Sequence, residues 1–63
     1  MSQHFVFLSK DTTLVPQSLN DADAGEIIRS LLLQQFSLSP LRLQADNSRE
    51  ALEKYYSLKF KHN

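Results

Sequence analysis

The chain has 63 residues without a cysteine, and its seven basic side chains balance seven acidic ones. This length allows a single small domain, residues 1–63, and the missing cysteines exclude disulfides and thiolate metal sites. No run approaches the roughly 20 apolar residues that span a bilayer, and no basic residue precedes the first apolar run as in a secretory signal, so we expect a soluble cytoplasmic protein without membrane contact.

The first third of the chain predicts a β-hairpin. Residues 5–8 are a continuous apolar run that is rich in strand-forming residues and too short for a helix. Both faces of this run are apolar, which is typical of a central strand. Residues 9–12 suit a turn, and residues 13–15 predict a second strand that ends at Pro16, because proline has no N–H to donate to a ladder.

A first helix is predicted after residue 22. Asp23 and Glu26 have the spacing of a capping box, in which the first side chain accepts from N–H groups of the first turn and the second reaches back to the cap. Apolar residues then recur at helical spacing. Because Pro40 restricts the residue before it to extended conformations, we expect the helix to end near Phe36 or Ser37.

The last third predicts a strand followed by a second helix. Residues 41–45 alternate between apolar and polar, as in a half-buried strand. Asn47 and Glu50 repeat the capping-box spacing and mark a helix start. The apolar stripe of that helix holds Ala51, Leu52, Tyr55 and either Leu58 or Lys59. Tyr56 lies beside the stripe, so the pattern leaves open which of the two tyrosines is buried.

These elements predict an α+β fold with the order ββαβα. We expect a three-stranded, mainly antiparallel sheet in the order 2-1-3, with the first strand central and two helices packed on the sheet. Two helices on one face would leave the other face open, with large side chains around Phe5 and Phe7 exposed. We therefore expect a homodimer. In the alternative, each helix covers a different face and the monomer is complete.

The sequence offers no recognisable catalytic set. His4 and His62 stand near opposite ends of the chain, so no pair of histidines has the spacing of metal ligands, and Asp21 and Asp23 are better explained by a polar loop and a helix cap than by a cation site. The serines have no histidine in mid-chain to activate them, and a single glycine cannot build a phosphate loop. We therefore expect a protein that is not an enzyme and that uses neither a cofactor nor a metal.

The second half of the chain favours binding. Residues 41–63 hold five basic and three acidic side chains, a net charge of +2, whereas residues 1–40 hold two basic and four acidic ones, a net charge of −2. We expect a protein partner to contact Phe5, Phe7, Tyr56, Lys59, Phe60 and Lys61. In the alternative, nucleic-acid phosphates meet Arg49, Lys54, Lys59 and Lys61, and exposed aromatic rings stack on bases.

The sequence as a whole predicts a small protein-interaction module that acts as a regulator, inhibitor or adaptor. In size and composition it is similar to accessory proteins of bacteria and phages, an analogy that does not define a family. We assign no family. Residues 47–52 look like the start of the second helix of ribbon–helix–helix proteins, but Pro40 and the alternating run 41–45 stand where that family has a single strand directly before its first helix.

Overall fold

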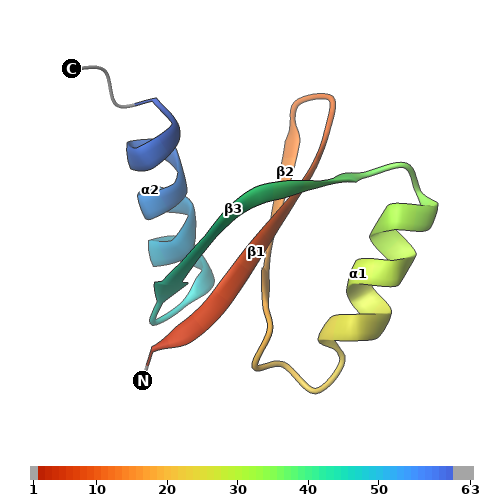
Figure 1. The fold of residues 1–63 in the computed structure, drawn as a ribbon, viewed down its shortest axis with the longest axis horizontal. Helices are drawn as coiled ribbons and strands as arrows, with labels where there is room; N and C mark the ends of the chain where they lie inside the picture. Colours follow the sequence, from red (N-terminus) through yellow and green to blue (C-terminus); the bar gives the residue numbers. More distant parts are fainter. Residues whose placement is uncertain (1, 61–63) are drawn as a thin grey trace.

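The computed structural model describes residues 2–60, which form an α+β fold (Figure 1). Its elements, in chain order, are β1 (Gln3–Lys10), β2 (Thr13–Ser18), α1 (Ala24–Leu33), β3 (Ser37–Ala45) and α2 (Ser48–Lys59). The strands form one sheet in the order β2-β1-β3, and β1 is antiparallel to both of its neighbours. The predicted element order and strand order are both confirmed.

The two helices lie on opposite sides of this sheet (Figure 1). Phe5, Val6, Phe7 and Leu8 of β1 are all buried. Because successive side chains of a strand point to opposite faces, Phe5 and Phe7 share one face and Val6 and Leu8 the other. Phe5 and Phe7 belong to the core cluster beneath α2, and Figure 1 places α1 beyond the opposite face.

The expectation that Phe5 and Phe7 lie on an open sheet face is therefore wrong. Their exposed fractions are 1% and 0%. A strand that is apolar on both faces needs a cover on each, and the chain supplies one helix per face. The reason for expecting a homodimer through the sheet face disappears with this arrangement.

Both edge strands run through a proline, contrary to the predicted boundaries. β2 continues beyond Pro16 to Ser18, and β3 begins at Ser37 instead of residue 41. Each of these strands has a neighbour on one side only, so a proline can face outward without costing a ladder hydrogen bond. The β1–β3 register also shifts between Val6 and Leu8, where the facing segment of β3 contains Pro40.

The start of α1 differs from the predicted capping box. Asp23 stands at the N-cap position, but its side chain makes no capping hydrogen bond. Asp21 takes over part of this role, since its carboxylate accepts from the Asp23 N–H at 3.4 Å and its carbonyl oxygen accepts from the Ala24 N–H at 3.1 Å. The carboxylate of Asp21 thus bonds within the loop that leads into the helix.

The end of α1 comes at Leu33, three residues before the earlier of the two predicted ends. The Phe36 N–H donates to the Leu31 carbonyl and the Gln35 N–H donates to the Leu32 carbonyl, both at 3.0 Å. This pair of bonds is a Schellman motif, which needs a left-handed residue just after the helix. Gln35 fills that position with φ 72°.

Replacing Gln35 by glycine should stabilise the protein. Glycine adopts a positive φ without the Cβ clash that glutamine has there. We expect Gln35→Gly to raise the free energy of unfolding by about 0.5–1 kcal/mol, measured by urea denaturation followed by circular dichroism. Gln34→Gly is the matched control, because Gln34 has φ −87° and gains nothing from glycine. A Gln35→Gly protein less stable than wild type would contradict this account.

The start of α2 follows the predicted pattern with one change. The Asn47 side chain accepts from the Glu50 N–H at 2.8 Å, as in a capping box. The Glu50 carboxylate accepts from the Asp46 N–H at 3.3 Å, one residue before the cap, and pairs with Lys54 at 3.3 Å. The hydrogen bond that the Glu50 carboxylate accepts from the Asp46 N–H lowers the pKa of Glu50 below its ordinary value of 4.5, and the contact with Lys54 lowers it further.

Acid should therefore weaken the start of α2. Because the folded pKa of Glu50 lies below its unfolded value, ionised Glu50 stabilises the folded state above about pH 4.5 and this contribution fades as the pH falls through the folded pKa. We expect the urea midpoint of the wild type to fall more steeply between about pH 5 and about pH 3 than that of Glu50→Gln. Parallel pH curves for the two proteins would contradict the assignment.

Candidate interaction surface

The C-terminal turns of α2 carry large side chains that the core does not absorb. Tyr55 is 3% exposed and packs against the sheet, so it is the buried member of the tyrosine pair. Tyr56 is 48% exposed, and Leu58 and Phe60 are each 58% exposed. We call Tyr55, Tyr56, Leu58, Lys59 and Phe60 together the α2 end surface.

A chain of aromatic rings connects this surface to the core. The Phe7 and Tyr55 ring centroids are 4.5 Å apart, and the Tyr55 and Tyr56 centroids are 5.8 Å apart in an edge-to-face pair. Tyr56 stacks in turn on Phe60 at 5.8 Å. Such pairs add to the stabilisation from buried area, so the two exposed rings are held in place by the buried ones.

Lys59 is anchored on Tyr55. Its ammonium lies 5.4 Å from the Tyr55 ring centroid and donates a hydrogen bond to the Tyr55 hydroxyl at 3.2 Å. The two residues are one helical turn apart, so this contact follows from helix geometry. The stem of Lys59 thus covers the buried ring while its charge stays at the surface.

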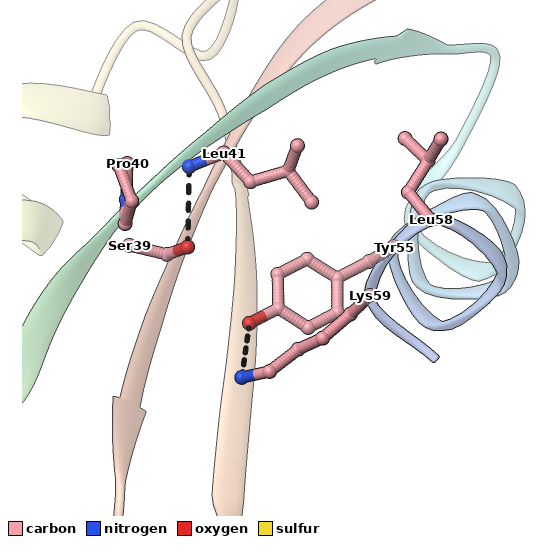
Figure 2. A pocket seen from close by; sticks show the side chains of 6 residues that line it. All are labelled: Ser39, Pro40, Leu41, Tyr55, Leu58 and Lys59. Carbon is pink, nitrogen blue, oxygen red and sulfur yellow. Dashed lines mark hydrogen bonds between the residues drawn. The ribbon is translucent and has the colours of Figure 1, made fainter. Parts of the chain in front are cut away.

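A groove separates α2 from β3, with a volume of about 300 Å³. It is lined by Ser39, Pro40, Leu41, Tyr55, Leu58 and Lys59. Figure 2 shows Leu41 reaching from β3 and Tyr55 and Leu58 reaching from α2 toward the same space, with the Tyr55 hydroxyl bonded to Lys59. We call this the β3 groove.

A second groove of about 200 Å³ lies between α2 and the turn that joins β1 to β2. Its lining includes Asp11 and Leu14 from the hairpin and Tyr56 and Phe60 from α2. Tyr55 and Lys59 line this groove as well as the β3 groove. Tyr55 and Lys59 therefore lie between the two grooves. Of the exposed apolar side chains, Leu58 lines the β3 groove, and Tyr56 and Phe60 line the second groove.

Sequence reasoning found part of this surface. Tyr56, Lys59 and Phe60, three of the residues predicted to contact a partner, lie together at the end of α2. Phe5 and Phe7 lie in the core instead, and Lys61 lies outside the described residues. Leu58 and the β3 segment around Pro40 are not among the predicted contact residues, because the helical spacing makes Leu58 a candidate for the buried stripe and Pro40 gives no signal of a groove.

Within residues 2–60, the three cations predicted to meet phosphates do not gather on one face. Arg49, Lys54 and Lys59 follow one another at intervals of five residues, and at about 100° per residue each interval turns about 140° around the helix. Lys54 is also engaged, with Glu50 at 3.3 Å and with the Gln44 carbonyl at 2.9 Å. A nucleic-acid backbone along α2 would meet one of these three cations at a time.

A further group of exposed apolar side chains lies near the turn between α1 and β3. Leu33, the last residue of α1, is 75% exposed, and Leu32 and Leu38 are also exposed. Leu32 and Leu33 are exposed because the three consecutive leucines at the end of α1 cannot all point toward the sheet, and Leu38 is an exposed residue of β3. We call Leu32, Leu33 and Leu38 together the α1 end leucines.

Within residues 2–60, no three histidine or acidic side chains lie close enough together to hold a metal ion. No helix in the same part of the chain is both long enough and apolar enough to cross a membrane. Comparisons of the chain with protein-family models, with curated protein sequences and with solved structures gave no significant match.

Proposed function

We propose that this protein is a small non-enzymatic interaction module, a regulator, inhibitor or adaptor, that binds a protein partner through the α2 end surface. One observation carries the proposal: Tyr56, Leu58 and Phe60 are 48% to 58% exposed at the end of a helix whose residue Tyr55 is buried in the core. Aromatic side chains that are preorganised and beside a groove are typical anchors of protein interfaces.

The test compares capture of partners by three forms of the tagged protein from lysate of the cells it comes from. We expect a stoichiometric protein partner on the wild type and on Leu19→Ser, which removes an exposed apolar side chain outside both the α2 end surface and the α1 end leucines. The double variant Tyr56→Ser/Phe60→Ser should lose that partner. Equal capture by all three forms would reject the α2 end surface as the binding site.

Nuclease treatment of the same lysate separates this proposal from nucleic-acid binding. Contacts with phosphates release counterions and disappear when the polymer is digested or the salt is raised. A partner that survives nuclease supports a protein interface. Loss of every partner with nuclease would instead favour nucleic-acid binding through the cations of the second half of the chain.

Self-association and a cytoplasmic location are further parts of the proposal. The α1 end leucines, and not the sheet face, now support the homodimer, because exposed apolar patches commonly mark interfaces. Sedimentation at tens of micromolar should show a dimer for the wild type and a monomer for Leu33→Ser. A monomeric wild type would reject the proposed homodimer. The lack of cysteine suits a reducing compartment such as the cytoplasm.

A further inference from the structure

We infer that the β3 groove binds a peptide segment in which an apolar side chain stands next to a carboxylate. The inference rests on the proposed function and names the chemistry of the partner. The groove of about 300 Å³ is at the lower end of the range for ligand sites, a size that suits one or two side chains. Its walls are mostly carbon, from Pro40, Leu41, Leu58 and the Tyr55 ring.

The polar groups of the groove are donors. The Tyr55 hydroxyl oxygen accepts from Lys59, and among the described residues it donates to no protein acceptor. The Ser39 hydroxyl oxygen likewise accepts from the Leu41 N–H at 3.2 Å, and among the described residues this hydroxyl donates to no protein acceptor. The Lys59 ammonium has three protons and uses one of them on Tyr55.

The charge of the groove selects an anion. Lys59 is the charged residue of the lining, which contains no aspartate or glutamate. A carboxylate beside Lys59 could accept from the ammonium and from the Tyr55 hydroxyl together, and hydrogen bonds to charged groups are the stronger kind. The second groove lacks this preference, because Asp11 lines it as well as Lys59.

The peptide would be held by its side chains and not by adding a strand to β3. Strand addition needs free N–H groups along the outer edge of a sheet. At this groove Pro40 has no N–H, and the Leu41 N–H is bonded to Ser39. Recognition therefore falls to the apolar wall and the three donors.

The first experiment follows amide chemical shifts while blocked dipeptides are titrated into the ¹⁵N-labelled protein. The probes are acetyl-Leu-Asp-amide and acetyl-Leu-Asn-amide, which differ in one charge. We expect saturable shifts at the amides of Ser39, Leu41 and residues 55–59 with the Asp peptide, and at least about fivefold weaker binding of the Asn peptide. Equal binding of the two peptides, or shifts confined to other residues, would overturn the inference.

Two conservative variants test the assigned groups. Tyr55→Phe keeps the buried ring and removes the hydroxyl, and Lys59→Met keeps the stem and removes the charge. Each should weaken binding of the Asp peptide and reduce its advantage over the Asn peptide. Lys54→Met is the matched control, because it removes a cation from another side of the same helix and should leave binding unchanged. Competition by inorganic phosphate as strong as that by the Asp peptide would identify a general anion site and overturn the peptide assignment.

These results can be told apart from failure of the proposed function. If the partner captured from lysate is lost by Tyr56→Ser/Phe60→Ser but kept by both Tyr55→Phe and Lys59→Met, the interaction module stands and the peptide inference fails. If the Asp peptide binds as expected but no protein partner is retained by the wild type, the groove assignment stands and the proposed function fails.

Discussion

Phe7→Ala should unfold this protein, or nearly so, at room temperature. Phe7 lies on the central strand, is 0% exposed and contacts the Tyr55 ring at a centroid distance of 4.5 Å. Truncating a buried phenylalanine to alanine typically costs about 3–5 kcal/mol through lost burial and the cavity left behind. Small domains have total stabilities of about the same size, so the variant should lose most of its cooperative urea transition.

Phe60→Ala is the matched control for this change. It makes the same truncation at a residue that is 58% exposed, and we expect a loss of no more than about 1 kcal/mol. The pair also separates stability from binding, because Phe60→Ala should weaken partner capture while the fold persists. A Phe7→Ala protein that unfolds at the same urea concentration as Phe60→Ala would show that the core does not depend on this ring.

Ala51→Leu should destabilise the protein by about 1–3 kcal/mol, the usual cost of forcing extra methylenes into a packed core. Ala51 is 0% exposed and belongs to the same core cluster as Ala45, which is 1% exposed. Two small residues there allow α2 to approach the sheet closely. A leucine would push the helix outward and disturb the packing of Tyr55, one helical turn farther along.

Ser57→Leu provides the comparison for Ala51→Leu. It places a leucine on the exposed side of the same helix, so helix propensity is changed without altering the core, and we expect an effect within about 0.5 kcal/mol. Both proteins would be measured by urea denaturation followed by circular dichroism. Equal stability of the two variants would mean that the space at Ala51 is larger than the structure shows.

The α2 end surface was partly predictable. Tyr56 and Phe60 could be singled out because they lie beside the apolar stripe of a helix that starts at Asn47, and Lys59 because it is a cation between them. The β3 groove could not, because its walls come from segments about 15 residues apart that meet only in the folded chain. Pro40 in particular predicts a chain break between the first helix and a strand that starts at residue 41, whereas it lies inside an edge strand and lines the groove.

Local patterns along the chain are enough to predict the order of the elements and the central place of β1 in the sheet. Local periodicity, the Asn47 cap and the two-sided apolar run of residues 5–8 all act over a few neighbouring residues, so they can be read without knowing the fold. The face that each helix covers, the identity of the buried tyrosine and the positions of the grooves are set by tertiary packing. These depend on how elements far apart in the chain share apolar surface, and local patterns allow more than one such arrangement.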